Sequence, residues 1–193
     1  MPTRLTYSLL IPCFVMTSCM GGLQYKMDTT AFKMITPAPP SRGPVPDTYI
    51  DTNMSISGMF GGKIRTRKPY AVGSDYTDES FTLEAVEFTR VMVTYGDGTA
   101  DPGAAAFKLP RRFDARPYES YNSMSGGRVV KSTVNSISGK LRGVITRDED
   151  FTLLLEGTVI KKDGTREPFN LKERYEPIRD TTTRSWAEVI SEV

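Results

Sequence analysis

The sequence predicts an all-β protein, an antiparallel β-sandwich or barrel that ends in a short C-terminal helix. Apolar and polar residues alternate over several segments, which is the period of a strand with one buried face. Two Asp-Gly pairs, Asp97-Gly98 and Asp163-Gly164, are typical of tight turns between antiparallel strands. No strand-like segment is followed by a helical pattern and a second strand, which disfavours a parallel βαβ architecture.

The first eighteen residues have the organisation of a secretory signal peptide. A positive charge at Arg4 precedes an apolar stretch from Leu9 to Met16, and the small residues Thr17 and Ser18 stand directly before Cys19. The apolar stretch is shorter than the roughly 20 residues that a membrane-spanning helix needs. This segment therefore predicts export of the chain.

The four residues Met16-Thr17-Ser18-Cys19 resemble the lipobox of bacterial lipoproteins. In that class a diacylglycerol is attached to the cysteine sulfur, and signal peptidase II cuts before the cysteine. The resemblance implies that residues 1–18 are removed and that Cys19 becomes the lipid anchor. A residue other than Asp at position 20, here Met20, implies by the same resemblance an outer-membrane lipoprotein. The alternatives are ordinary secretory cleavage near Gly21 or Gly22, and a buried N-terminal helix.

Residues 19–47 are predicted to form a lipidated N-terminus followed by a tether. Residues 20–35 show no sustained period, and residues 36–47 contain five prolines. Proline interrupts helices and cannot donate to a sheet ladder. An extended Pro-rich segment of this length reaches on the order of 35 to 40 Å. We therefore expect a single β-rich domain over residues 48–193, held away from the membrane.

The first part of this domain is expected to form long strands. From residue 48, Ile50, Thr52, Met54 and Ile56 alternate with polar residues, which predicts a half-buried strand. In residues 81–95 the apolar positions change phase twice, which predicts one long strand with bulges. Residues 102–127 are rich in Gly, Pro, Arg and Tyr and are predicted to form a long loop or an edge excursion.

The second part contains the clearest strand pair. Ile137, Leu141 and Ile145 are expected to face inward from one strand. Residues 151–175 read as a hairpin, with apolar residues at alternate positions on both arms and Asp163-Gly164 in a type I′ turn. Because Asp-Gly tolerates the positive φ values of that turn, the sequence predicts where the chain reverses.

The C-terminus is the only segment with a helical period. Trp186, Val189, Ile190 and Val193 are spaced so that they share one helix face. Ser185 and Glu188 match a capping box, in which each residue binds the backbone amide of the other. We expect a short helix that packs Trp186 against the sheet.

Composition excludes several kinds of chemistry. The chain has no histidine, and its two cysteines, Cys13 and Cys19, both lie in the signal region. Nucleophilic Ser-His and Cys-His arrangements are therefore excluded, as are zinc sites with His or Cys ligands. The balance of 25 basic against 23 acidic residues does not resemble that of a nucleic-acid binder. We predict no cofactor and no metal site, and assign the acidic residues Asp97, Asp101 and 148–150 to turns.

Two basic groups are candidates for ligand binding. The first follows Lys63, and the second lies beside two tyrosines in residues 111–121. Arginine and lysine side chains could hold an anionic partner, such as a phosphorylated headgroup or an acidic glycan. The simpler interpretation is a solvated strand face and a charged loop. The candidate residues are Arg65, Arg67, Lys68, Arg111, Arg112, Tyr118 and Tyr121.

Together these features predict a non-enzymatic, membrane-anchored envelope lipoprotein whose β domain binds or scaffolds another envelope component. Its expected partners are the membrane, through the Cys19 lipid, and an envelope protein or glycan, and no catalytic residue is assigned. The alternative is a glycan-binding module or a carboxylate-based glycan-acting enzyme, since glycosidases need two carboxyl groups and no histidine. Against this alternative, the strand patterns show no Asp or Glu at an inward position flanked by Trp or Tyr.

Overall fold

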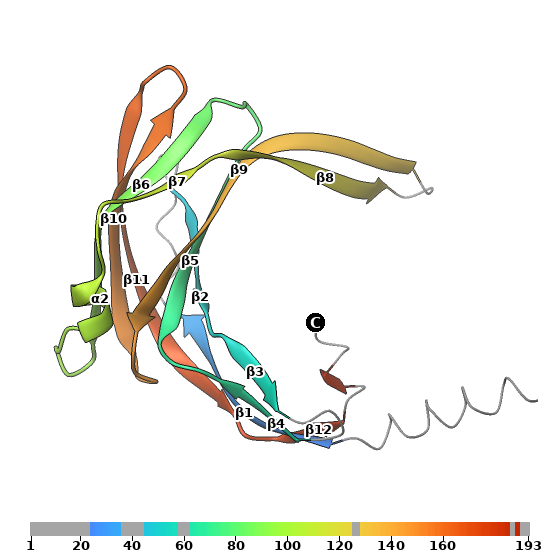
Figure 1. The fold of residues 1–193 in the computed structure, drawn as a ribbon, viewed down its shortest axis with the longest axis vertical. Helices are drawn as coiled ribbons and strands as arrows, with labels where there is room; N and C mark the ends of the chain where they lie inside the picture. The colour runs from blue at the N-terminus through green and yellow to red at the C-terminus, as the bar shows by residue number, and fades with distance from the viewer. Residues whose placement is uncertain (1–23, 36–44, 58–61, 125–127, 186–187, 190–193) are drawn as a thin grey trace, which may run out of the picture. The chain divides into compact units, whose positions relative to one another are not determined.

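The fold is all-β and sandwich-like, as the sequence predicts (Figure 1). The structure is a computed structural model that describes residues 24–35, 45–57, 62–124, 128–185 and 188–189. Within these residues the chain forms twelve strands and a five-residue helix, α2 (Pro102–Ala106), and residues 188–189 are also helical. The predicted signal peptide, Cys19 and most of the predicted Pro-rich tether lie outside the described residues.

The chain divides into two compact units. Of the described residues, unit 1 contains 24–30, 54–57, 62–67, 179–185 and 188–189, and unit 2 contains 31–35, 45–53, 68–124 and 128–178. Strands β1 (Gln24–Met34) and β11 (Arg166–Asp180) each run from one unit into the other. Unit 2 holds most of the described residues.

Unit 2 contains two sheets (Figure 1). The first has the order β1-β11-β10-β6-β7, where the new members are β6 (Leu83–Tyr95), β7 (Arg111–Asp114) and β10 (Phe151–Lys161). The second has the order β2-β5-β9-β8, with β2 (Asp47–Asp51), β5 (Tyr70–Asp78), β8 (Arg116–Met124) and β9 (Arg128–Ile145). The described pairings that join β10 to β11, β6 to β7 and β10, and the strands of the second sheet are antiparallel.

The core of unit 2 lies between these two sheets. In β10 every second residue is buried, and Phe151, Leu153 and Leu155 are at most 1% exposed. They belong to one cluster with residues of the second sheet, including Val72 and Leu141. Burying such side chains stabilises a fold by roughly 1.5 to 3 kcal/mol each. The alternation recognised in the sequence therefore corresponds to the buried face of a sandwich.

Unit 1 is built around a mixed sheet, whereas the sequence predicted antiparallel pairing throughout. Strand β4 (Gly62–Thr66) pairs in parallel with β1 and antiparallel with β3 (Met54–Ser57). Strand β12 (Thr183–Ser185) pairs antiparallel with β1. Tyr25, Met27 and Ile64 form its small core. Alternation identifies a strand with one buried face, but it carries no information about the direction of the neighbouring strand.

Two segments are more regular in the structure than the sequence suggested. Strand β1 lies in the range assigned to the lipidated N-terminus and tether, where the buried Tyr25 and Met27 alternate with exposed residues. Of the two alternatives for residues 102–127, the long loop is wrong, because the segment contains α2 and the two edge strands β7 and β8. The Gly and Pro residues of this segment disfavour strands when they are judged from sequence alone. The strands form because β7 pairs with β6 and β8 pairs with β9.

Both Asp-Gly pairs reverse the chain where predicted, but the turn at Asp163-Gly164 is not the predicted type I′ turn. In β10–β11, Ile160 pairs with Arg166, and the Gly164 amide donates to the Lys161 carbonyl at 2.9 Å. Gly164 has a φ of 87°, while Asp163 is not among the residues with positive φ. This is the pattern of a type I turn followed by a glycine bulge. The Asp163 carboxylate instead accepts a hydrogen bond from the Thr165 amide at 2.8 Å, so the side chain stabilises the turn by binding its backbone.

The bulges predicted in residues 81–95 are present in β6. The register between β6 and β10 shifts twice, at Glu156/Gly157 and at Ile160/Lys161, which confirms the predicted irregularities.

The C-terminal capping box predicted from the sequence is formed. The Ser185 amide donates to the Glu188 carboxylate at 2.6 Å, and the Glu188 amide lies 3.4 Å from the Ser185 hydroxyl. The capping pair is therefore present, but Trp186 and most of the expected helix lie outside the described residues.

Asp78 organises the connection between β5 and β6. Its carboxylate accepts hydrogen bonds from the amides of Ser80 at 2.9 Å and Leu83 at 2.7 Å, and from the hydroxyls of Ser80 and Thr82. Burial alone would raise the pKa of Asp78, but these bonds outweigh it and lower the pKa to about 2. The ionised side chain therefore stabilises the folded state.

We expect the stability of the protein to fall in acid partly through Asp78. The pKa is about 2 when folded and near 3.8 for the free side chain, so the contribution is complete above pH 4 and is lost as the pH falls toward 2. Because the side chain is partly solvated, we expect on the order of 1 to 2 kcal/mol. Urea unfolding of the wild type and Asp78→Asn between pH 6 and 2 measures it. A stability difference that does not shrink below pH 4 would refute this assignment.

Candidate anion-binding hollow

Helix α2 is held in place by a buried aspartate. Asp101 caps the helix, accepting the Gly103 amide at 2.6 Å, and Pro102 stands at the start, where a missing N–H is tolerated. The same carboxylate accepts the Thr146 amide at 2.7 Å and hydroxyl at 2.8 Å, together with the Tyr95 hydroxyl. Burial acts to raise the pKa of Asp101, but these hydrogen bonds outweigh it and lower the pKa. Asp101 thus ties α2 to β6 and to the end of β9.

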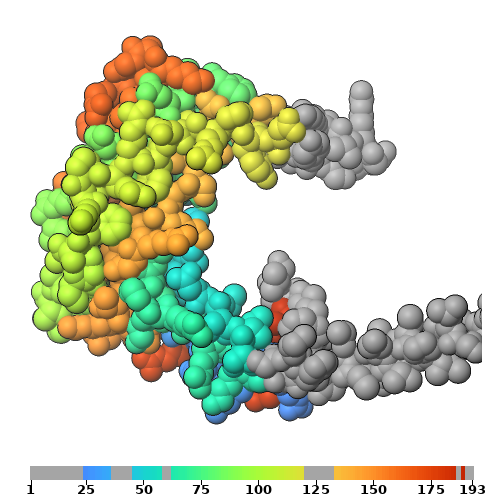
Figure 2. Space-filling view, viewed as in Figure 1, coloured from blue at the N-terminus to red at the C-terminus, as the bar shows by residue number. Residues whose placement is uncertain are grey.

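The segment from α2 to β7 approaches β9 closely at two points. At one end, a side chain on Gly103 would meet the Gly143 carbonyl oxygen at 2.1 Å. At the other, a side chain on Gly139 would meet the Phe113 ring at 2.7 Å. Both contacts require the absence of a Cβ atom, so glycine determines how near these backbones lie. On the face shown in Figure 2, residues of α2 and β7 (yellow-green) lie beside β9 (orange).

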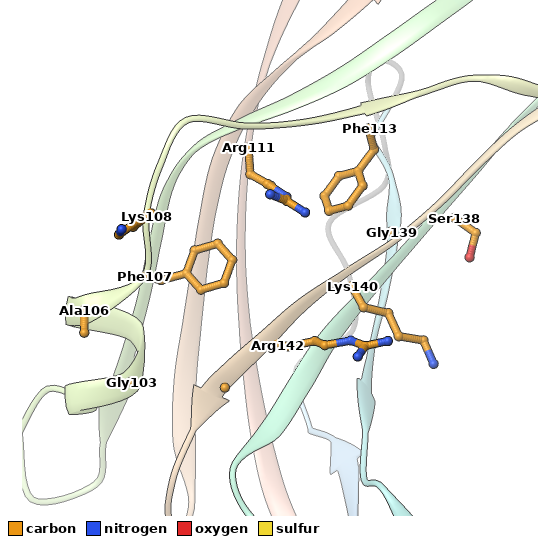
Figure 3. A pocket seen from close by; sticks show the side chains of 11 residues that line it. Gly103, Ala106, Phe107, Lys108, Arg111, Phe113, Ser138, Gly139, Lys140 and Arg142 are labelled. Atoms are coloured by element: carbon orange, nitrogen blue, oxygen red, sulfur yellow. The ribbon is translucent and has the colours of Figure 1, made fainter.

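Between these two contacts the surface is hollowed. The hollow has a volume of about 920 Å³ and lies between the α2–β7 segment and β9 (Figure 3). Phe107 and Phe113 contribute apolar walls and also pack against the core. Phe113 is fixed by an edge-on contact with Phe88, with 5.9 Å between ring centroids. The volume falls in the range of small-molecule sites, about 300 to 1,000 Å³.

The hollow carries positive charge only. Lys108, Arg111, Lys140 and Arg142 line it, and none of its eleven lining residues is acidic. The Arg111 guanidinium lies 5.8 Å from the Phe113 ring centre, a favourable cation–π distance. Asp51 partly compensates the charge from outside, because Lys140 binds it at 2.5 Å, and this hydrogen bond raises the pKa of Lys140. Within the described part of the chain, Lys108, Arg111 and Arg142 have no carboxylate within 4 Å.

The residues of the first predicted basic group belong to two units. Arg65 lies in β4 of unit 1, where its guanidinium is 3.7 Å from Asp28. Arg67 is exposed in the same unit, after β4. Lys68 belongs to unit 2 and binds Asp148 at 2.9 Å. Residues that are adjacent in sequence are thus assigned to different parts of the fold, and two of the three already have acidic neighbours.

The second predicted group is divided between two faces of β7. Arg111 lines the hollow, whereas Arg112 binds Glu84 and Asp114, each at 2.7 Å. Neighbouring residues of a strand point to opposite faces, so only one of the pair can face the hollow. Tyr118 is exposed in β8, and Tyr121 is outside the residues whose side chains are described.

Sequence reasoning missed Lys108, Lys140 and Arg142 as members of one site. Lys140 and Arg142 are two residues apart on one strand, which was a detectable signal for a shared basic face. Their proximity to Arg111 depends on the two glycine contacts between distant segments. Nothing in the local pattern indicates those contacts.

Sequence reasoning also missed an inward carboxylate. Glu173 is 3% exposed and lies in phase with Leu171 and Tyr175 on the buried face of β11, contrary to the expectation that no such residue exists. It accepts hydrogen bonds from the hydroxyls of Tyr175 at 2.7 Å and Thr48 at 2.5 Å. Burial raises the pKa of Tyr175, as does its bond to Glu173. This carboxylate links the two sheets inside the core and does not line the hollow.

Comparison of the chain with models of protein families, with curated proteins and with solved structures gives no match. Among the described residues, no three His, Cys, Asp or Glu side chains are grouped as metal ligands. No helix in the described ranges is long and apolar enough to cross a membrane. The hollow and the N-terminal motif are therefore the features that indicate a function.

Proposed function

We propose that this protein is a non-enzymatic, lipid-anchored envelope protein that binds an anionic ligand in the hollow between α2, β7 and β9. The observation that carries the proposal is the presence of four cationic side chains, and of no carboxylate, among the lining residues. Such a concentration of like charge is unfavourable without a counter-charge. A bound anion would relieve it.

The residues of the hollow can hold a ligand without performing chemistry on it. Arg111 offers a planar guanidinium that can form two parallel hydrogen bonds with a carboxylate or phosphate. Phe107 and Phe113 would cover an apolar or planar part of the same ligand. The cations are exposed, so we expect binding to weaken as salt screens them.

The anchor is part of the proposal and is supported by the resemblance of Met16-Thr17-Ser18-Cys19 to a lipobox. A lipid at Cys19 would hold the protein at a membrane, for which we propose the outer membrane. The ligand would then be an anionic component of the envelope, carried by a protein or a glycan.

We expect removal of two of the cations to weaken anion binding at least tenfold. Arg111→Ala/Arg142→Ala removes two charge-assisted contacts, and each tenfold loss in affinity corresponds to about 1.4 kcal/mol. Titration calorimetry with tripolyphosphate, using the full mature chain in nonionic detergent, measures the change.

The matched control is Arg90→Ala/Arg166→Ala, which removes the same charge from residues paired with Glu156 and Glu87 away from the hollow. We expect less than a twofold change for this control. Equal losses in both double variants would show that net charge, rather than the hollow, governs binding, and would overturn the proposal.

A further inference from the structure

We propose that the anion is carried by an extended acidic peptide segment whose backbone pairs with the free edge of β9 inside the hollow. This inference rests on the proposed function and specifies the partner. A strand edge offers unpaired N–H and C=O groups, and an added segment satisfies them while its side chains provide specificity.

The free edge follows from the pairing of β9. Residues 128–136 of β9 pair with β8, and residues 135–145 pair with β5 on the other side. Beyond residue 136, β9 therefore has β5 along one edge and, among the described strands, none along the other. The hollow opens on this part of β9, where Ser138, Lys140 and Arg142 line it.

The length of the open edge limits what can pair with it. It is bounded by the contact of Gly139 with Phe113 and by that of Gly143 with Gly103. The four steps from Gly139 to Gly143 span about 13 Å. Between them, Lys140 and Arg142 line the hollow, whereas the Leu141 side chain is buried in the core. An extended segment would thus pair over about three residues, which is a short and weak form of strand addition that needs side-chain contacts to support it.

The cations are placed to provide those contacts on both faces of an added strand. Gly139 faces Phe113, so Arg111, which lies over the Phe113 ring, is on that face of β9. Lys140 and Arg142 alternate with Gly139 and belong to the opposite face (Figure 3). Successive side chains of an extended segment also alternate between faces. A segment of consecutive acidic residues would therefore meet a cation on each side.

The test uses acetylated, amidated pentaglutamate, the same peptide with N-methyl groups on alternate residues, and a fully N-methylated form. Because a strand presents only one edge to β9, alternate methylation still leaves one edge able to pair, whereas full methylation leaves none. We expect the alternately methylated peptide to bind like the parent peptide and the fully methylated one at least tenfold more weakly. Calorimetry with the full mature chain in nonionic detergent gives the three affinities.

Tripolyphosphate, which has no backbone edge, separates the two proposals. If it binds and the alternately and fully methylated peptides bind with equal affinity, strand addition is overturned while anion binding in the hollow stands. If neither tripolyphosphate nor pentaglutamate binds, both proposals fail. Loss of the difference between the two methylated peptides in Arg111→Ala/Arg142→Ala, but not in Arg90→Ala/Arg166→Ala, would further support pairing at this edge.

Discussion

Replacing Cys19 with alanine is expected to release the protein completely from membranes. The substitution removes the sulfur that accepts the diacylglycerol in proteins with such a lipobox. Two acyl chains of about 15 methylenes each, at roughly 0.8 kcal/mol per buried methylene, provide on the order of 20 kcal/mol of hydrophobic driving force. Wild-type protein should partition into the detergent phase of a phase-separation assay and incorporate labelled palmitate, whereas Cys19→Ala should do neither.

Cys13 provides the matched control, because it lies in the segment that lipoprotein processing would remove. Cys13→Ala should leave both partitioning and palmitate labelling unchanged. A mature wild-type chain that begins near Gly21 or Gly22 by mass spectrometry, and that stays in the aqueous phase, would identify ordinary secretory cleavage and refute the anchor.

Replacing Asp101 with alanine is expected to destabilise the fold by about 3 to 5 kcal/mol. Asp101 is 0% exposed, and its loss leaves the Gly103 and Thr146 amides and the Tyr95 hydroxyl without their acceptor. Each unsatisfied buried donor costs roughly 1 to 3 kcal/mol. Urea unfolding at neutral pH measures the loss, and α2 should be the first element to lose protection from amide exchange.

The matched control for Asp101 is Asp150→Ala. Asp150 is a half-exposed side chain whose carboxylate is 3.5 Å from Arg174. Exposed ion pairs contribute about 0 to 1 kcal/mol, so this variant should unfold within 1 kcal/mol of the wild type. Similar stability losses in the two variants would show that the burial of Asp101 has no special role.

The fold could be predicted from sequence wherever one face of a strand is buried and the other is solvated. Leu153 and Leu155 in β10 show this clearly, since alternation at period two has a single structural interpretation over so long a run. Glu173 shows the limit of the same argument. It occupies an inward position and was still overlooked, because a carboxylate is expected to face solvent unless hydroxyl donors from other elements satisfy it.

The candidate site was predicted only in part, because it depends on distances between segments remote in sequence. Arg111 was predicted because it lies in a basic group beside two tyrosines. Its separation from Arg112 follows from the pleat of β7, which points the two side chains to opposite faces. Lys140 and Arg142 share a hollow with Arg111 only because Gly103 and Gly139 allow α2 and β7 to approach β9. A basic residue can be recognised locally, whereas a concentration of charge is a property of packing.

The sequence by itself therefore determined the all-β class, the positions of the chain reversals and the lipobox-like motif, because each depends on residues within a few positions of one another. Tertiary structure alone decided that β1 and β4 run parallel and that β9 has a free edge. It also decided that four cations line one hollow. Local preferences are short-range energies summed along the chain, whereas strand partners and clustered charges are selected by burial and packing among distant segments.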